Sequence, residues 1–297
     1  HSRRRLTMPK PPTDWTVLSM LEWATSYFEE KGIDNGRFSI EWLLAELLQV
    51  KRLDLYLLFD RPLTQEELEE LRPLVKRRAS HEPLQYITGE TDFYNCRIKV
   101  TPDVLIPRPE TEELVDYILR SVSRQNSLNC LDIGTGSGCI PISLKKENPH
   151  WELSATDIST EALQIARSNA DLNDTEVHFV QDSILEPAAF ASTDIFDVII
   201  SNPPYILPNE KDSLDREVKD YEPELALFCK STKQIYGAIR SFAELHLKRS
   251  GQLFLEIHEH YSEEVLSLFT DENWSAEVVE DFNNKPRFIH ATYVKNL

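Results

Sequence analysis

Apolar residues in roughly the first eighty positions recur every three or four residues, which is the spacing of amphipathic helices. The pattern predicts one helix capped by Asp14, a second over about 38–50 and a third over about 64–79. No group of catalytic side chains falls in this stretch. We therefore expect a small helical bundle that serves docking or substrate selection.

The third predicted helix carries two local signals. Thr64, followed three residues later by Glu67, is a capping-box signature for its first turn. Pro73 lies inside the same periodic run, and proline lacks an N–H and clashes with the preceding helical turn. A kink or a break is therefore expected at Pro73.

A change of period marks the end of the helical region. Residues 86–100, around Gly89, show the alternation of a hairpin or short strand pair, and this segment is expected to link two domains. The predicted organisation is a helical domain over 1–84, a β-hairpin linker over 85–104 and an α/β domain over 105–297.

The remainder of the chain alternates strand-like and helix-like runs, as a doubly wound α/β sheet does. The last two predicted strands have no helical run between them, so the final strand is expected to be antiparallel. Strands are predicted near 129–133, 152–156, 177–181, 196–201, 251–257, 275–280 and 288–294, and helices near 110–123, 140–147, 160–171, 234–248 and 261–270.

Composition narrows the class of protein. The chain has 297 residues, of which 41% are hydrophobic and 28% charged, as in ordinary globular proteins, and no apolar run reaches the roughly 18–20 residues that span a bilayer. The net charge of −18 disfavours general binding to nucleic-acid phosphates. Four dispersed cysteines without a C-x-x-C pair favour neither disulfides nor a zinc site, and fit a reducing compartment. The basic start, 1–5, lacks the apolar segment of a secretory signal, and its origin as a tag remnant or the tail of a transit segment stays open.

Three of the eight glycines fall in one loop, Gly134-Thr135-Gly136-Ser137-Gly138, directly after a predicted strand and before a predicted helix. Glycine there permits a tight turn and close approach of the main chain to a ligand. The G-x-G-x-G spacing differs from the longer G-x-G-x-x-G form that suits a pyrophosphate. We therefore expect this loop to bind a nucleoside cofactor.

Acidic residues follow the next two predicted strands. Asp157 comes about twenty residues after the glycines, where a carboxylate accepts hydrogen bonds from both ribose hydroxyls. A helix cap is the alternative interpretation for Asp157. Asp182 and Ser183 end the third strand and are expected beside the adenine, although an Asp in this position is also ordinary turn chemistry.

The most informative segment is Asn202-Pro203-Pro204-Tyr205, which follows the apolar strand 196–201. The two prolines stop the strand, so Asn202 is presented in a rigid loop at its carboxyl end, where open α/β sheets bind ligands. The Asn oxygen and a proline-held carbonyl are two acceptors suited to the two N–H groups of a planar –NH₂. This pattern predicts chemistry on an amide or amino nitrogen.

The order of these motifs resembles that of class I S-adenosylmethionine-dependent methyltransferases. Three further segments extend the resemblance: Pro83-Leu84-Gln85-Tyr86-Ile87-Thr88-Gly89, Leu105-Ile106-Pro107-Arg108-Pro109-Glu110-Thr111-Glu112 and Tyr221-Glu222-Pro223-Glu224-Leu225-Ala226-Leu227. With the helical N-terminal region, they make essentially the whole chain similar to the HemK/PrmC family of peptide chain release factor N5-glutamine methyltransferases.

The resemblance implies a seven-stranded Rossmann-like methyltransferase sheet with an N-terminal all-α bundle. It also implies transfer of a methyl group from S-adenosyl-L-methionine, which becomes S-adenosyl-L-homocysteine, to the side-chain amide of the glutamine in the Gly-Gly-Gln motif of class I release factors. Family members often carry an aromatic residue at the position of Ser183, so stacking on the adenine is in question here.

The resemblance also assigns roles to residues. The cofactor is expected to contact Gly134, Thr135, Gly136, Ser137, Gly138, Asp157, Asp182, Ser183 and Asn202, with Arg108, Glu110 and Thr111 lining its pocket. The glutamine is expected to contact Asn202, Pro203, Pro204 and Tyr205, of which Asn202, Pro203 and Tyr205 are the catalytic candidates. No metal is expected.

Other acceptors and roles stay open at this stage. A ribosomal-protein glutamine or an amino group of a nucleic-acid base are alternative acceptors, although the net charge of −18 weighs against the base. A non-catalytic adaptor is a third possibility. The expected partner is a release factor, with no direct need for nucleic acid or a membrane, and the expected state is a monomer. The expected location is the bacterial cytoplasm, or an organellar matrix if the basic start is a transit remnant.

Overall fold

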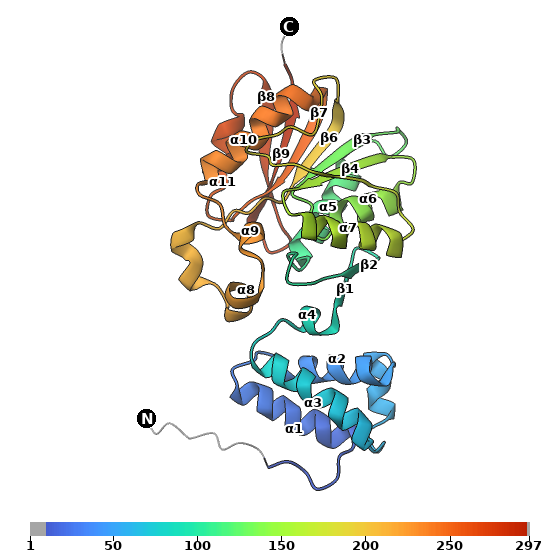
Figure 1. Cartoon of the computed structure of the whole chain (residues 1–297). Helices are drawn as coiled ribbons and strands as arrows, with labels where there is room; N and C mark the ends of the chain where they lie inside the picture. Colours follow the sequence, from blue (N-terminus) through green and yellow to red (C-terminus); the bar gives the residue numbers. More distant parts are fainter. Residues whose placement is uncertain (1–9, 296–297) are drawn as a thin grey trace. The chain divides into compact units, whose positions relative to one another are not determined.

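The computed structural model describes residues 10–295 (Figure 1). The basic segment 1–5, whose origin the sequence left open, lies outside the described residues. The described residues form two compact units: one contains residues 10–89 together with Arg216–Tyr221, and the other contains Glu90–Asp215 and residues 222–295. Within the described chain, no helix is long and apolar enough to cross a membrane.

The first unit is helical, as the three- and four-residue spacing predicted. Apolar residues on one side of each long helix form its core, which includes Leu21, Phe28, Ile40 and Leu71. Its elements are α1 (Val17–Glu30), α2 (Gly36–Leu48), the 3₁₀ helix η1 (Arg52–Leu57), α3 (Gln65–Ala79), α4 (Leu84–Thr88) and α8 (Arg216–Tyr221).

The predicted cap of α1 is wrong, whereas the predicted cap of α3 is confirmed. Asp14 does not cap α1: the Thr16 hydroxyl accepts the Ser19 N–H at 3.2 Å, and the Ser19 hydroxyl accepts the Thr16 N–H at 2.9 Å. Thr16 takes the role because it directly precedes the first helical residue, whereas Asp14 is too far upstream. The capping box of α3 is confirmed, since Thr64 and Glu67 exchange hydrogen bonds of 3.1 and 2.9 Å.

Pro73 does not break α3, contrary to the prediction. The helix is continuous from Gln65 to Ala79 with Pro73 inside it. Both Pro73 and Glu69, whose carbonyl has lost its helical donor, are exposed. Water can therefore solvate the carbonyl that the proline leaves without a hydrogen bond.

The predicted hairpin is shorter and begins later than expected. Tyr86–Thr88 belong to α4, and Gly89, with φ +81°, ends that helix instead of forming a hairpin turn. The hairpin consists of β1 (Glu90–Phe93) and β2 (Cys96–Lys99). Its two-residue turn is Tyr94-Asn95, both with positive φ, which matches the twist of antiparallel strands.

The second unit is built on a seven-stranded sheet within the described chain, with strand order β5-β4-β3-β6-β7-β9-β8. The five strands from β5 to β7 pair in parallel, and β9 is antiparallel to both β7 and β8, as predicted. The strands are β3 (Asn129–Ile133), β4 (Glu152–Asp157), β5 (His178–Gln181), β6 (Phe196–Ser201), β7 (Leu247–Glu256), β8 (Trp274–Glu280) and β9 (Pro286–Tyr293).

Helices cover both faces of this sheet (Figure 1). The large ones lie close to their predicted ranges, whereas the helix predicted over 261–270 is divided into α11 and a 3₁₀ turn. The helical elements are α5 (Pro109–Ser121), α6 (Cys139–Glu147), α7 (Thr160–Leu172), η2 (Pro208–Ser213), α9 (Glu224–Leu227), α10 (Thr232–His246), α11 (Ser262–Leu266) and η3 (Ser267–Phe269).

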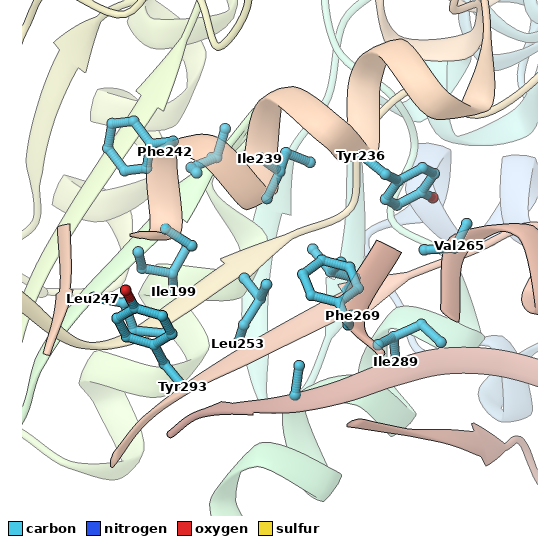
Figure 2. Packing of buried hydrophobic residues seen from close by; sticks show 14 of the residues in the cluster. Ile199, Tyr236, Ile239, Phe242, Leu247, Leu253, Val265, Phe269, Ile289 and Tyr293 are labelled. Carbon is cyan, nitrogen blue, oxygen red and sulfur yellow. The ribbon is translucent and has the colours of Figure 1, made fainter. Parts of the chain in front are cut away.

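Alternation along β7 assigns its side chains to opposite faces. Leu253 joins the cluster in which α10 contributes Tyr236 and Ile239 (Figure 2). Phe254 meets the ring of Tyr117 from α5, with ring centroids 6.0 Å apart, and therefore lies on the other face. Burial of an apolar side chain of this size stabilises the fold by about 1.5–3 kcal/mol.

The sheet changes direction between β3 and β6. The chain proceeds from β3 outward to β4 and β5, and then returns to place β6 on the opposite side of β3. Ile133 and Ser201 are partners in this pairing, so the glycine loop and Asn202 leave the sheet at neighbouring positions. Such a switch point is where open α/β sheets bind ligands.

Candidate active site

A cavity of about 530 Å³ lies at the carboxyl ends of the parallel strands. Most of the predicted site residues line it: Arg108, Thr111, Gly134, Thr135, Gly136, Ser137, Asp157, Asp182, Ser183, Asn202, Pro203 and Pro204. Three do not, namely Gly138, Glu110 and Tyr205. The structure thus brings the predicted nucleoside-binding and amide-binding residues to one cavity, and leaves these three outside its walls.

The glycine loop is tied to the end of β4. The N–H groups of Gly134 and Thr135 both donate to the Thr156 carbonyl at 2.9 Å. Gly136 has φ +56° and no atom close to the position of a Cβ, so it is open toward the cavity. Gly138 has φ +81°, and a Cβ there would come within 3.1 Å of Ala166 on α7. Gly138 therefore serves the close packing of α6 on α7, although it does not line the cavity.

Asp157 is not the N-cap of α7, because the Ser159 hydroxyl takes that role by accepting the Ala162 N–H at 3.1 Å. Asp157 Oδ2 accepts the Gly136 N–H at 2.8 Å, and its Oδ1 accepts the Ser159 N–H at 2.9 Å. Burial raises the pKa of the Asp157 carboxyl, against the effect of these N–H donors. Each oxygen keeps lone pairs for a further donor, so a diol in the cavity has two acceptors available.

Asp182 and Ser183 lie in a turn after β5. The Asp182 N–H donates to the Asp157 carbonyl at 3.1 Å, and Asp182 Oδ1 accepts the Ala188 N–H at 2.9 Å. One oxygen of the Asp182 carboxylate is therefore already hydrogen-bonded to a main-chain N–H of the turn. Because both residues also line the cavity, the turn places polar atoms beside the Asp157 end of the site.

Exposed aliphatic side chains form part of the cavity wall, which sequence reasoning missed. Ile158 is 52% exposed, Leu185 49% and Leu225 67%, and all three line the cavity. Apolar side chains this exposed, converging on one cavity, are typical of a binding site. In the sequence, the sign of this apolar wall was Ile158, which directly follows Asp157, the acid expected to bind ribose. These side chains offer apolar contact for a planar base where Ser183 cannot stack.

The Asn202–Tyr205 loop is rigidly anchored on both sides. The Ser201 hydroxyl donates to the Ile133 carbonyl at 2.7 Å, and Ile206 pairs with the segment after α9 through hydrogen bonds of 2.9 and 3.0 Å. Asn202 lines the cavity, and within residues 10–295 no group hydrogen-bonds its side-chain amide. The loop thus presents a free carboxamide oxygen at the switch point.

Tyr205 differs from expectation. It lines a separate, smaller cavity together with His258, whose ring it meets edge-on with centroids 6.0 Å apart. Burial and the nearby Glu256 carboxylate raise the pKa of the Tyr205 phenol. Tyr205 thus lies outside the larger cavity although the three residues before it line that cavity, and the sequence could not show on which side Tyr205 would emerge.

Two buried carboxylates anchor the segment 106–111, which forms another wall of the cavity. Glu222 accepts the Ile106 N–H at 3.1 Å and pairs with Arg108 at 2.5 Å. Glu256, at the end of β7, accepts the Thr111 hydroxyl at 2.8 Å, and burial raises its pKa to about 7. These contacts hold Arg108 and Thr111 at the cavity and leave Glu110 outside it.

Asp132 is a further residue that sequence reasoning missed. It is fully buried in β3, two residues before Gly134, and burial raises its pKa to about 8. Among the described residues, neither of its oxygens nor the Thr135 hydroxyl oxygen has a hydrogen-bond partner. In the sequence, the unusual feature was an acidic residue inside the apolar run of a predicted strand. Such an unsatisfied group beneath a cavity indicates a function beyond packing.

Two family models match the chain. The model described as PrmC N-terminal domain matches residues 19–89, and the model described as Methyltransferase small domain matches residues 113–217. In the described part of the chain, no group of three His, Cys, Asp or Glu residues is placed to hold a metal ion.

Curated relatives are similar over most of their length. The chain is 40% identical to the release factor glutamine methyltransferase of Geobacter sulfurreducens, over 89% of this chain and 91% of the relative. It is 38% identical to the protein of the same name from Chlorobaculum tepidum, over 92% of this chain and 96% of the relative. The corresponding protein from Lactococcus lactis is 41% identical, over 79% of this chain and 85% of the relative.

Proposed function

This chain belongs to the release factor glutamine methyltransferase family, and we propose that its acceptor is the side-chain amide N5 of the glutamine in the Gly-Gly-Gln motif of class I release factors. The protein is an S-adenosylmethionine-dependent methyltransferase, and its fold is that of class I. The observation that supports the choice of acceptor is the free Asn202 carboxamide in the cavity wall next to the glycine loop.

The cavity fits the methyl donor. The main chain at Gly136 is open toward the cavity, and Asp157 offers acceptors for ribose hydroxyls. The exposed aliphatic side chains of Ile158 and Leu185 are suited to the faces of an adenine. Bound S-adenosylmethionine supplies an electrophilic methyl group. The role of Asp182 and Ser183 is to border the base with polar atoms.

The acceptor amide needs positioning more than it needs a base. An amide nitrogen is a poor nucleophile because its lone pair is delocalised into the carbonyl. Asn202 Oδ1 and the Pro203 carbonyl accept its two N–H groups, which orients the nitrogen and favours positive charge developing on it. Pro203 and Pro204 limit the motion of these acceptors, since their φ angles are restricted. The amide proton becomes acidic once nitrogen carries the methyl group, so water suffices to remove it.

The partners follow from this assignment. The net charge of −18 supports a protein substrate over direct binding of nucleic acid. We further propose that the chain acts as a monomer, with its helical unit contributing to recognition of the release factor. Its place of action is where translation terminates, which for the bacterial relatives is the cytoplasm. Light scattering of the purified chain measures its molar mass and so tests whether it is a monomer.

The test of the acceptor is methyl transfer from labelled S-adenosylmethionine. A class I release factor, the same factor with asparagine in place of the Gly-Gly-Gln glutamine, ribosomal protein and DNA are compared side by side. We expect label in the unaltered release factor alone, at the glutamine, as located by mass spectrometry of its peptides. Label in the asparagine variant, or preferential label in ribosomal protein or DNA, would contradict the proposed acceptor.

A further inference from the structure

A second cavity, of about 230 Å³, shares a wall-forming loop with the first. Asn202, Pro203 and Pro204 line the first cavity, whereas Tyr205 and Ile206, the next two residues, line the second. The remaining residues that line the second cavity are Glu210, Ser213, Leu214, His258, Glu259 and Arg287. One short loop therefore borders both the proposed reaction site and this additional space.

The acidic groups of the second cavity already have partners. Glu210 accepts the Tyr261 hydroxyl at 2.5 Å and the Leu207 N–H at 2.9 Å. Glu259 pairs with Lys285 at 3.5 Å. Both carboxylates are thus already engaged by protein groups, and their negative charge makes the cavity unfavourable for an anion.

Arg287 is the cationic group in this cavity, and it has unused hydrogen-bonding capacity. Asp281 fixes it: its Oδ1 accepts the N–H groups of Asn283 and Lys285 at 2.8 and 3.1 Å, and its Oδ2 accepts Arg287 Nε at 3.1 Å. The Arg287 side chain is only 16% exposed. Within the described chain, no acceptor bonds its Nη1 or Nη2, so the outer edge of the guanidinium carries free donors.

We propose that the second cavity is a subsite for the main chain of the peptide segment that carries the acceptor glutamine, and that Arg287 Nη1 and Nη2 donate to its carbonyl oxygens. Peptide carbonyls are neutral acceptors, which suits a cavity that contains Glu210 and Glu259 beside the arginine. The glutamine side chain would reach Asn202 while its backbone lies along Tyr205 and Ile206. This inference rests on the proposed function, because it assumes a polypeptide substrate.

The first experiment replaces Arg287. Arg287→Lys keeps a cation beside Asp281 but removes the planar guanidinium and its paired N–H donors. Arg287→Met removes both the charge and the donors. Arg249→Met is the matched control, since Arg249 is exposed near the opposite end of β7 from Glu256. The substrates are a release factor and a nine-residue peptide centred on Gly-Gly-Gln. Peptide binding to the enzyme with S-adenosylhomocysteine is followed by fluorescence anisotropy.

Both Arg287 variants are expected to raise KM and Kd for the peptide by about 10- to 100-fold, because charge-assisted hydrogen bonds are lost. Their kcat is expected to stay within about threefold, since Asn202 and Pro203 still hold the amide. Affinity for S-adenosylmethionine, measured by calorimetry, should not change. The Arg249→Met control should match the wild type throughout.

Ser213→Trp gives a test that does not disturb Asp281. Ser213 is exposed and lines the second cavity, so a large side chain there should fill the space and raise KM for the peptide. Wild-type KM and Kd in Arg287→Lys and Ser213→Trp would overturn the subsite, as would an equal loss of S-adenosylmethionine affinity. Failure of the wild-type enzyme to methylate either substrate would instead overturn the proposed function.

Discussion

Arg108 and Glu222 form an ion pair across a sequence separation of 114 residues, with Nη2 and Oε1 2.5 Å apart. The other oxygen of Glu222 accepts the Ile106 N–H at 3.1 Å, and Arg108 Nη1 donates to the Ile106 carbonyl at 3.0 Å. Two of the segments that carry the resemblance to the family, 105–112 and 221–227, are thus joined directly. The pair stabilises one wall of the larger cavity, which we propose binds the methyl donor.

Glu222→Gln should weaken binding of S-adenosylmethionine by several fold and lower the free energy of unfolding by about 1–2 kcal/mol, because it leaves Arg108 without its buried counter-charge. The expected loss in free energy of unfolding is modest because the Arg108 side chain is 30% exposed. Calorimetry and thermal melts provide the two measurements. The control is Asp116→Asn, which breaks the exposed Arg120–Asp116 pair. Equal effects from the two variants would contradict a bracing role for Glu222.

Asn202→Ala should abolish turnover and leave affinity for S-adenosylmethionine within a few fold. The substitution removes the carboxamide oxygen that we propose accepts from the substrate amide, and it leaves the glycine loop and Asp157 unchanged. Single-turnover methyl transfer and calorimetry separate the two effects. Retention of full activity would refute the assignment of Asn202.

Substitutions of Asp157 should weaken the binding of S-adenosylmethionine to different degrees. Asp157→Asn keeps one acceptor and is expected to reduce affinity for S-adenosylmethionine by about tenfold, whereas Asp157→Ala loses both and should reduce it by about 100-fold. Asp171→Ala, at an exposed position on α7, is the control. Calorimetry gives each affinity. An Asp157→Ala variant that binds the donor like wild type would leave Asp157 with only its turn-forming hydrogen bonds.

Glu256 should make stability depend on pH. Its pKa is raised from 4.5 to about 7, because burial disfavours the charged form. The folded state therefore keeps a proton that the unfolded state loses, so this contribution to stability is full below pH 4.5 and decreases as the pH rises to about 7. Glu256→Gln retains an acceptor for Thr111 and does not titrate.

The variant should consequently gain in free energy of unfolding relative to wild type as the pH is raised, by about 1–3 kcal/mol between pH 5 and pH 8. Chemical denaturation at both pH values measures the difference. Glu272→Gln, at an exposed position, is the control and should show no such trend. A wild-type–variant difference that is the same at both pH values would contradict the raised pKa.

Thr64→Ala should destabilise α3 by about 0.5–2 kcal/mol, since the N-cap acceptor for the Glu67 N–H is lost. Thr64→Ser keeps the hydroxyl and should change stability by less than about 0.5 kcal/mol. Hydrogen exchange of the α3 amides in the full chain reports the effect on this helix. Equal exchange in the two variants would show that the capping box does not stabilise α3.

Local patterns predicted the elements more accurately than their ends. The strand at 129–133 and the capping box of α3 were read correctly, because both depend on a few neighbouring residues. Asp14 and Pro73 were misread, since a cap depends on where the first turn begins and a proline's effect on whether its lost hydrogen bond faces water. Gly89 was placed in a hairpin turn, whereas it ends α4.

The amino-acid sequence by itself determined which side chains stand at the ends of the strands. A strand alternates its residues and a glycine or proline ends it within a few positions, so the chemistry of Gly136, Asp157 and Asn202 was readable along the chain. Only the tertiary structure decided that Glu222 meets Arg108 and that Tyr205 faces a different cavity from Asn202. These relationships depend on how distant segments pack once water is excluded, and no short-range pattern encodes that.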